Sequence, residues 1–429
     1  MCIRDSDNHY HRVIETFIAL LIIFLRVKLP NYLDLAVIGA GVQALTLTTH
    51  LLQKSAKHHR KFLVFDPSQT WMSQWQQQFA AQQIPHLRSP AVHHPDPNPY
   101  QLRAFAELRK SELFPPYDRP GTKLFNDFCD EVIQRWKLAN KVYPAKVIQI
   151  LPIKRAARPR FQLVLDTGKT LIVRRVVLAT GSGKAQLPNW VEKITSDYPS
   201  DRLCHSQQVN LQRLNLRGEH ILIVGGGLTS GHLARGAIAL GATVTLMTRK
   251  QLQSKIFDAD PGWLGPKYLK NFHAQTDWDK RYQQIQQARN GGSMTPDIIQ
   301  KLRKATDEGK ARIDECCEIK DAQWQGNLWK VLCQDGSTHK FNRIWLATGT
   351  RFSATEHPLL QDVLEAYPTK LVNGLPVLDE HLRLPKSNFF IMGGLAALHI
   401  GPVARNIFGG KMACQRIVPA IVKSSLAIG

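Results

Sequence analysis

The chain has 429 residues, of which 43% are hydrophobic and 21% are charged. This length can bury a large core and favours two or three domains, and the composition is that of a globular protein rather than a disordered or fibrous one. The net charge of +22 is unusually high. It favours phosphorylated cofactors, anionic substrates, or contact of a basic face with an anionic partner or membrane surface. Nucleic acid would suit so basic a chain, but we find no nucleic-acid-binding module.

The cysteines form no pattern that would hold a metal or a redox disulfide. None of the seven lies in a CxxC pair, which argues against a thiol–disulfide redox centre and against a structural zinc site. The odd number favours a reducing compartment, so we expect a cytoplasmic protein without a bound metal. Cys316 and Cys317 are adjacent in an expected strand, where we expect buried thiols.

Residues 1–33 are not expected to belong to the fold. The first six, MCIRDS, resemble translated adapter sequence rather than native protein. Residues 17–25 are nine uninterrupted apolar residues, whereas a helix that spans a bilayer needs ~20. No signal-peptide cleavage pattern follows them. We expect a mistranslated leader or a docking helix here rather than a membrane anchor.

The first folded stretch, residues 34–66, is typical of a strand, a glycine turn, a helix and a second strand. Gly39 and Gly41 allow a tight turn and the close approach of a pyrophosphate, and Ala44 fills the third small position. The phosphates would lie at the helix N-terminus, where free N–H groups and the positive dipole end meet. Asp66 follows 27 residues after Gly39, where a carboxylate can accept hydrogen bonds from a ribose diol. The stretch predicts a dinucleotide site; the alternative is a tight turn without a ligand.

A segment rich in tryptophan and glutamine follows, and then a proline-rich loop up to Pro120. Seven prolines fall between Pro85 and Pro116, and they cannot lie inside helices. A loop this long in a compact domain is usually functional. Its aromatic and cationic residues suit a wall over a planar cofactor or substrate, although a surface loop explains each histidine as well. The candidates for cofactor binding are Trp75, His86 and Arg88.

An amphipathic helix and a strand meander complete the first half of the chain. The helix is expected at residues 123–136, and the three strands at 145–150, 161–165 and 171–178. The turn at 166–169 joins the last two strands as a hairpin. The third strand runs directly into an Ala-Thr-Gly segment, so Thr180 and Gly181 become cofactor candidates.

The same pattern restarts at residue 220. A strand at 220–224 leads into a turn with Gly225 and Gly227, and Ser230 takes the third small position. A helix is expected from about 232 to 240 and the next strand at 243–247. This strand ends without an acid. Arg249, 24 residues after Gly225, stands where a cation would bind the 2′-phosphate of NADPH, so NADH is the less favoured cofactor.

The second half ends like the first, with strands expected at 312–319, 329–333 and 341–346 that lead into Thr348 and Gly349. Gly39 to Thr180 spans 141 residues and Gly225 to Thr348 spans 123, so the chain contains two copies of one plan. The repeat predicts an α/β fold with two Rossmann-like dinucleotide-binding domains (three-layer ββα), each with a β-meander, the second inserted in the first. The expected bounds are 34–214 plus 341–429 for the first domain and 215–340 for the second, with an insertion at 251–309 that either caps the cleft or is purely structural.

Two glycine loops with paired Ala-Thr-Gly segments resemble the flavoprotein superfamily with two dinucleotide-binding domains, FAD first and NAD(P)H second. Within it, the chain resembles the class B flavin monooxygenases, in particular the lysine and ornithine N-hydroxylase branch. The resemblance covers residue 34 to the end, and the GxxxHxxxW pattern of Baeyer–Villiger enzymes is missing around His205. The segments that carry it are 202–206 (RLCHS), 257–265 (FDADPGWLG) and 344–349 (IWLATG).

The resemblance also implies how the chain closes on the flavin. A strand would end at Gly393 and Gly394, with Leu395 where the superfamily has an acid. Gly401 and Pro402 would open the closing helix, whose N-terminus would point at the flavin edge where negative charge develops on reduction. These four small residues are therefore cofactor candidates, and the helix should return to residues 34–66.

The function implied by this resemblance is an FAD-dependent, NADPH-using monooxygenase. It would oxygenate a small nucleophilic nitrogen or sulfur substrate with O2 through a flavin hydroperoxide. Because the flavin performs the chemistry, no catalytic side chains are expected. Two other hypotheses stay open: an NAD(P)H:acceptor reductase or oxidase without oxygenation, and a non-enzymatic flavoprotein module that uses the basic surface. The residues do not identify the substrate.

Overall fold

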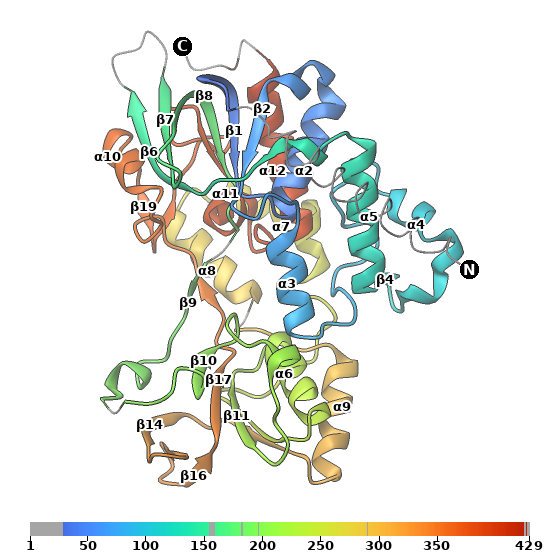
Figure 1. Ribbon diagram of the computed structural model, residues 1–429, viewed down its shortest axis with the longest axis vertical. Helices are drawn as coiled ribbons and strands as arrows, with labels where there is room; N and C mark the ends of the chain where they lie inside the picture. Colours follow the sequence, from blue (N-terminus) through green and yellow to red (C-terminus); the bar gives the residue numbers. More distant parts are fainter. Residues whose placement is uncertain are drawn as a thin grey trace, which may run out of the picture.

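Figure 1 shows the computed structural model of the chain, which describes residues 29–153, 159–181, 183–195, 197–289, 291–423 and 426. The apolar stretch at 17–25 and the leader residues before 29 lie outside the described residues. The fold is a mixed α/β fold with two largely parallel sheets.

The larger sheet contains the first glycine turn. Its strands lie in the order β5, β2, β1, β8, β7, β6, and β21 also pairs with β8. The strands β1, β2, β5, β8 and β21 are parallel, whereas β6, β7 and β8 form an antiparallel meander. All of β2 is buried, as expected for a central parallel strand with an unbroken apolar run. The bounds are β1 Tyr32–Ile38, β2 Phe62–Phe65, β5 Val142–Tyr143, β6 Val147–Ile153, β7 Arg160–Leu165, β8 Thr170–Leu178 and β21 Phe389–Ile391.

Two helices that are far apart in the sequence lie side by side in this half of the molecule (Figure 1). α2 (Val42–Lys54) follows the first glycine turn, and α12 (Ile407–Val422) is the closing helix. Gln43 of α2 donates from Nε2 to the carbonyl oxygen of Ala404, 3.0 Å away. The closing helix therefore returns to the first glycine loop, which confirms this part of the prediction from the sequence. It begins at Ile407, however, so Gly401 and Pro402 precede the helix and do not open it as expected, because Gly401 ends the short helix before it.

The second sheet contains the second glycine turn and is parallel throughout, in the order β10, β17, β11, β12, β13. The helices α6 (Leu228–Ala239) and α9 (Pro296–Asp307) pack together in its core. An antiparallel meander, β14–β15–β16, packs against the second sheet, and the two share a small core around Trp329. The bounds are β10 Leu203–His205, β11 His220–Val224, β12 Thr243–Thr248, β13 Ala311–Glu315, β14 Ile319–Trp324, β15 Trp329–Cys333, β16 Thr338–Phe341 and β17 Arg343–Leu346.

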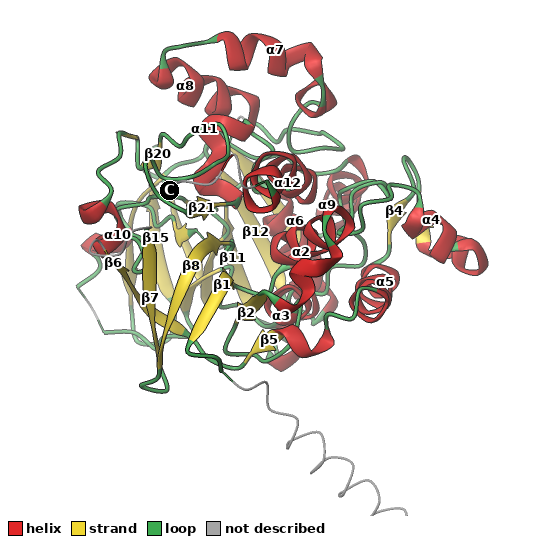
Figure 2. Ribbon diagram, turned by 90° about the horizontal axis from the view of Figure 1, so that it is seen from above, coloured by secondary structure: helices red, strands yellow, loops and turns green. Residues whose placement is uncertain are grey.

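The helices of the predicted insertion divide between the two halves. α7 (Pro266–Ala274) and α8 (Trp278–Arg289) place Phe272 and Ile285 in the core of the larger sheet. In contrast, Ile298 of α9 belongs to the core of the second sheet. Figure 2 shows α7 and α8 beside α11 (Ala397–Ile400), away from the strands. The insertion therefore contacts both halves of the molecule.

The remaining elements are short connectors and one long helix, α5, which matches the helix expected at 123–136. The proline-rich segment, expected as a loop, contains the short helix α4 and the two-residue strands β3 and β4. The bounds are α3 Ser73–Ala81, α4 Gln101–Phe105, β3 Leu113–Phe114, β4 Arg119–Pro120, α5 Thr122–Arg135, β9 Lys184–Ala185, β18 Thr350–Arg351, α10 Gln361–Ala366, β19 Leu371–Val372 and β20 Leu375–Pro376.

Two expectations about the second half are wrong. α6 begins at Leu228, four residues before the expected start, because Gly227 already serves as its N-cap. The strand expected at 312–319 is two strands: β13 ends at Glu315, Cys316 adopts a φ of 54°, and β14 begins at Ile319. As a result Cys316 is exposed and Cys317 only half-buried, which corrects the expectation of two buried thiols in one strand.

No helix in the described part of the chain is long and apolar enough to cross a membrane. Contact of the basic face with an anionic or membrane surface stays a prediction.

Candidate functional site

The first glycine loop connects β1 to α2 and packs against the end of β8. Gly39 adopts a φ of +97°, and a Cβ at this position would lie only 2.9 Å from the carbonyl oxygen of Ala179. Ala179 begins the Ala-Thr-Gly segment, so the loop and that segment are in contact, with Thr180 next to both. This close approach, together with the left-handed backbone, explains why residue 39 is glycine.

The N-terminus of α2 is open where a phosphate would bind. Gly41 is its N-cap, with φ −79° and no side-chain hydrogen bond to the free N–H groups. A Cβ on Gly41 would meet nothing within 4 Å. Ala44 is completely buried, where it allows the helix to pack closely. An uncapped helix start beside open space fits the pyrophosphate of a dinucleotide, since its N–H groups and dipole both favour an anion.

Asp66 lies at the end of β2, beside the same loop. Its Oδ2 accepts a hydrogen bond from the Ala40 N–H at 3.0 Å, and its Oδ1 accepts from the N–H and Oγ of Ser68. The carboxylate therefore holds the glycine loop in place. Oδ2 keeps capacity for one further donor, which a ribose hydroxyl could supply.

The second glycine loop has the same geometry between β11 and α6. Gly225 has a φ of +133°, and a Cβ there would overlap the carbonyl oxygen of Ala347, which begins the second Ala-Thr-Gly segment. Gly227 caps α6 without a side-chain bond and faces open space. Ser230 is completely buried and donates from Oγ to the Gly227 carbonyl at 2.6 Å. The two glycine loops, which are similar in sequence, therefore also have the same geometry.

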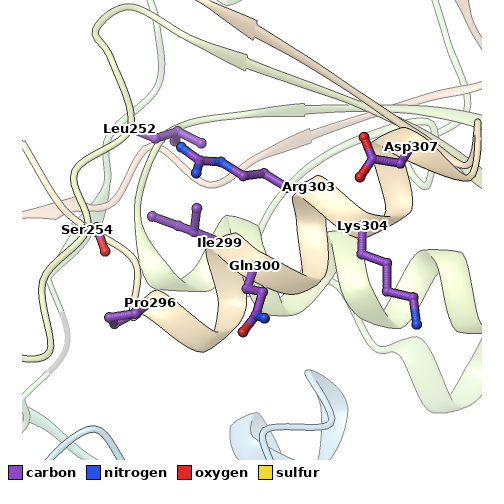
Figure 3. Close-up of a pocket in the computed structure, with 8 residues that line it drawn as sticks. All are labelled: Leu252, Ser254, Pro296, Ile299, Gln300, Arg303, Lys304 and Asp307. Carbon is purple, nitrogen blue, oxygen red and sulfur yellow. The ribbon is translucent and has the colours of Figure 1, made fainter.

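A pocket with a volume of about 430 Å³ opens between α9 and the loop after β12 (Figure 3). Leu252 joins this pocket to the second glycine loop, because a Cβ on Gly226 would lie 3.5 Å from Leu252 Cδ2. Figure 3 shows the Arg303 side chain pointing from α9 toward Leu252. Arg249, three residues before Leu252, is exposed at the end of β12. The lining residues are Leu252, Ser254, Pro296, Ile299, Gln300, Arg303, Lys304 and Asp307.

The two Ala-Thr-Gly segments meet where the chain passes between the two halves. β9 and β18, which follow the first and second segment, pair as antiparallel strands, and Figure 1 shows β9 between the two sheets. His205 Nε2 lies 3.0 Å from the carbonyl oxygen of Gly349, and the Thr180 hydroxyl lies 3.1 Å from His357 Nε2. The paired strands β9 and β18 therefore bring the segment with Thr180 and Gly181 close to the segment with Thr348 and Gly349.

The three candidates from the proline-rich region have different surroundings. Trp75 stacks on Phe79 with ring centroids 4.4 Å apart, and its indole N–H has no partner among the described residues. His86 stacks on Phe114, and burial lowers its pKa. Part of the predicted cofactor wall is therefore packed against protein, and the Trp75 N–H is itself buried, so its contact with a cofactor stays a prediction.

Arg88 connects the first half of the molecule to the insertion. It donates to the carbonyl oxygens of Lys255 and Ile256 at 2.7 and 2.6 Å, and to Oγ of Ser293 at 2.7 Å. Burial lowers its pKa to about 10. The structure gives Arg88 a role in holding the insertion, so its contact with a cofactor stays a prediction.

The predicted FDADPGWLG segment forms an ionic clamp between the insertion and the closing helix. Arg289 at the end of α8 pairs with Asp258 at 2.6 Å and donates to the Pro402 carbonyl at 2.7 Å. Asn406, the N-cap of α12, donates to the other Asp258 oxygen at 3.1 Å. Burial alone would raise the pKa of Asp258, but Arg289 and its neighbouring arginines hold it below the usual value. We call Asp258, Arg289 and Asn406 the ionic clamp.

The residues of the Gly393–Pro402 stretch are buried beside the first glycine loop. Gly393 has a φ of +75° and lies close to the Gln43 side chain, while Gly394 packs on the ring of Phe352. Gly401 has a φ of +87° and faces the insertion residue Trp263. The stretch therefore lies where the insertion, α12 and α2 come together.

Comparison with known proteins identifies the family. A family model described as L-lysine 6-monooxygenase/L-ornithine 5-monooxygenase matches residues 31–352. The chain belongs to this family. It is therefore an oxidoreductase of the monooxygenase type, as the sequence predicts. Among curated protein sequences, none matches the chain.

Solved structures of monooxygenases have the same fold. The reduced ornithine hydroxylase of Pseudomonas aeruginosa has a TM-score of 0.72 and 15% identity, over 91% of this chain and 98% of that one. The FAD-bound cadaverine monooxygenase of Erwinia amylovora has a TM-score of 0.74 and 13% identity, over 92% of this chain and 95% of that one. An ornithine N-hydroxylase from a Kutzneria species, solved with reduced FAD, NADP⁺ and L-ornithine, has a TM-score of 0.74 and 14% identity, over 91% of this chain and 99% of that one. At sequence identities of 13–15%, the similarity to these structures shows that the fold is shared.

The sequence did not reveal several residues of this region. Arg303 faces the loop after Arg249 only because α9 packs on α6, and no local pattern announces this. Gln43 is one of several polar residues in α2, which also contains three threonines and a histidine, and no local pattern distinguishes it. The segment that holds Asp258 was recognised, but its partner Arg289 lies in a polar helix whose position depends on tertiary packing.

Proposed function

We propose that this chain is an FAD-dependent, NADPH-using monooxygenase that hydroxylates an amine nitrogen of a small substrate. The observation that carries the proposal is the pair of matching glycine loops. Each has an uncapped helix start beside open space, one with an acid at the following strand end and the other with the exposed cation Arg249. Relatives with this fold were solved with FAD and with NADP⁺.

The two loops support a division into two Rossmann-like dinucleotide-binding domains, the second inserted in the first. We propose that the chain crosses between them at the β9–β18 pair. The bounds expected from the sequence end the first domain at residue 214 and resume it at 341, so they place β10 and β17 in the first domain. In the structure, however, both strands belong to the second sheet. We assign them to the second domain.

In the first domain, Gly39, Gly41 and Ala44 would receive the FAD pyrophosphate at the start of α2, and Asp66 the ribose. Thr180 and Gly181, with Gly393, Gly394, Gly401 and Pro402, would line the flavin half of the site. Bound flavin supplies the transfer of electrons from NADPH to O2 and of one oxygen atom to the substrate. The chain's own task is to orient the cofactors and exclude water, which suits the closure of the insertion on Pro402 by the ionic clamp.

In the second domain, Gly225, Gly227 and Ser230 would hold the NADPH pyrophosphate at the start of α6. Arg303 lines the pocket next to this loop, and Arg249 lies exposed three residues before the pocket residue Leu252. Two guanidinium groups suit a 2′-phosphate, whose oxygens accept paired hydrogen bonds. The apolar pocket residues Leu252 and Ile299 suit the adenine ring. This arrangement supports NADPH over NADH.

The substrate class is proposed from the family. Its solved members are named for ornithine, lysine and cadaverine, and all three molecules carry a primary amine at the end of an alkyl chain. We propose a small molecule with such an amine as the substrate, and O2 as the second substrate.

The test is turnover of the FAD-loaded protein with NADPH and ¹⁸O2 in the presence of L-ornithine, L-lysine or cadaverine. We expect a hydroxylamine that carries one labelled oxygen atom, measured by mass spectrometry. NADPH oxidation without an oxygenated product from any primary amine would favour a reductase or oxidase. If the flavin is not reduced by NADPH at all, the binding-module hypothesis takes its place.

A further inference from the structure

Two cysteines that are 16 positions apart in the sequence are in contact beside the second sheet. Sγ of Cys317 lies 3.3 Å from Sγ of Cys333. Cys317 precedes β14 and Cys333 ends β15, and these strands pair with Ile319 opposite Cys333. A disulfide has an S–S distance of about 2.05 Å. The two sulfur atoms therefore need to approach by little more than an ångström to form one.

This thiol pair is connected to the strand end that carries Arg249. The Cys317 N–H donates to the carbonyl oxygen of Thr248 at 2.9 Å. Glu315, two residues earlier, accepts from the Leu252 N–H at 2.7 Å. The turn between β13 and β14 thus holds the segment from Thr248 to Leu252 at both of its ends. A displacement of Cys317 is passed through this hydrogen bond to the residue before Arg249.

The pair differs from the other cysteines in its surroundings. Cys333 is 1% exposed, and Cys317 is half-buried, so a small oxidant reaches Cys317 first. Burial, followed by the hydrogen bond with Cys333, raises the pKa of Cys317 to about 12. Because the thiolate is the reactive form, the pair stays reduced at neutral pH until an oxidant persists. Cys129 and Cys414 are completely buried in the other core, without a thiol neighbour among the described residues.

We propose that Cys317 and Cys333 form a reversible disulfide in the presence of hydrogen peroxide, and that this disulfide weakens NADPH binding. Peroxide oxidises the Cys317 thiol to a sulfenic acid, with release of one water. The Cys333 sulfur then attacks the Cys317 sulfur and displaces the hydroxyl group, which leaves with the Cys333 proton as a second water. Two thiols lose two electrons in total, and one peroxide becomes two waters. The effect on NADPH rests on the proposed function, whereas the formation of the disulfide does not.

The first measurement maps the disulfide in the full-length, FAD-loaded protein. Wild type, Cys317→Ser, Cys333→Ala and the control Cys316→Ser are treated with hydrogen peroxide, denatured under thiol-blocking conditions and digested for mass spectrometry. Wild type and Cys316→Ser should yield a linked peptide pair through Cys317 and Cys333, and dithiothreitol should remove it. Absence of this peptide in wild type, or a linkage through Cys316, would overturn the proposal.

The second measurement follows NADPH binding by fluorescence titration before and after the same treatment. The dissociation constant should rise severalfold in oxidised wild type and Cys316→Ser, return after reduction, and stay constant in Cys333→Ala. An unchanged constant in wild type with a mapped disulfide would overturn the coupling. If reduced wild type does not bind NADPH, the proposed function fails together with the coupling, while the peptide map still decides on the disulfide.

Discussion

At the scale of single residues, the two glycines of each loop have different tasks. Gly39 needs its left-handed backbone and its contact with Ala179, whereas Gly41 has an ordinary φ and faces open space. We therefore expect Gly41→Ala to fold with a stability within ~0.5 kcal/mol of wild type. The added methyl group would occupy the space of the pyrophosphate and weaken FAD binding by about tenfold or more, ~1.4 kcal/mol. Urea unfolding of the FAD-free protein and an FAD titration measure the two effects.

Gly39→Ala is the matched opposite. The left-handed backbone costs ~1–3 kcal/mol for a residue with a side chain, and the new Cβ would lie 2.9 Å from a carbonyl oxygen. Gly39→Ala should therefore lower the stability of the FAD-free protein as well as its affinity for FAD. Equal stabilities of the two alanine variants would contradict this division of tasks.

The cations beside the second loop decide between the two nicotinamide cofactors. A hydrogen bond to a charged group contributes about 1.5–3 kcal/mol. Arg249→Ala and Arg303→Ala should therefore each raise the KM for NADPH by roughly tenfold or more and leave the KM for NADH nearly unchanged. Lys301→Ala, exposed on the same helix as Arg303 but outside the pocket, is the control. An equal effect on both cofactors would contradict a role at the 2′-phosphate.

Residues of the glycine loops could be predicted because their requirements are local. A tight turn, a helix start and a strand end within 33 residues leave a pattern that the sequence itself displays. Arg88 and Trp75 are predicted from the sequence as cofactor-binding residues, and this stays a prediction. The partners of Arg88 lie 167 to 205 positions further along the chain, so no local pattern indicates that it holds the insertion.

At the scale of elements, the ionic clamp holds α8 against the start of the closing helix. Arg289→Met removes the ion pair with Asp258 and the hydrogen bond to Pro402. Loss of these partly buried charged bonds should cost about 1–3 kcal/mol and increase hydrogen exchange in α7 and α8. Lys280→Met, an exposed change on the same helix, should leave both unchanged. Uniform loss of protection over the whole chain would argue against a local clamp.

The same clamp has a pH dependence of known sign. The folded state holds the pKa of Asp258 below its usual value. The stabilisation from its ionised carboxylate is therefore complete above the pKa of an unfolded aspartate, ~3.9, and is lost as the pH falls through the lower pKa of the folded state. Protection of α7 and α8 should therefore decrease below about pH 4 in wild type. In Asp258→Asn this acid-dependent step should be absent.

Strands with unbroken apolar runs were located closely, since β2 and β11 have the bounds expected from the sequence. The error at residues 312–319 has a physical cause. β13 extends the parallel sheet and β14 opens the meander, and three residues lie between them, of which Cys316 has a left-handed backbone. No glycine or proline marks this turn in the sequence, so the change of sheet was not expected.

At the scale of the whole molecule, the chain passes from the larger sheet to the second sheet through β9 and returns through β18. These two strands pair with each other. The insertion adds a second connection, because α8 packs with the first half and α9 with the second. These long-range contacts could not be predicted from the repeat, which describes each half by itself. They make the stability of the two halves interdependent, so that a charge buried in either half affects the fold as a whole.

Buried histidines in both halves provide the test of this interdependence. Burial lowers the pKa of His93, His94 and His399 to about 4, and that of His232 on α6 to about 3. An unfolded histidine has a pKa of ~6.5. Between these values the unfolded chain binds protons that the folded chain excludes, so stability is full above pH 6.5 and falls as the pH decreases toward 4.

Each such group therefore contributes a loss of stability that grows as the pH falls from 6.5 toward its folded pKa. Urea unfolding between pH 6.5 and 5 isolates the histidines, because the carboxylates titrate mainly at lower pH. We expect a single unfolding transition whose free energy decreases over this range, with a smaller slope in His232→Leu. If the two halves unfolded independently, two transitions would separate in this range, and His232→Leu would change only the one that belongs to the second sheet. A flat profile would show instead that these histidines are protonated in the folded protein.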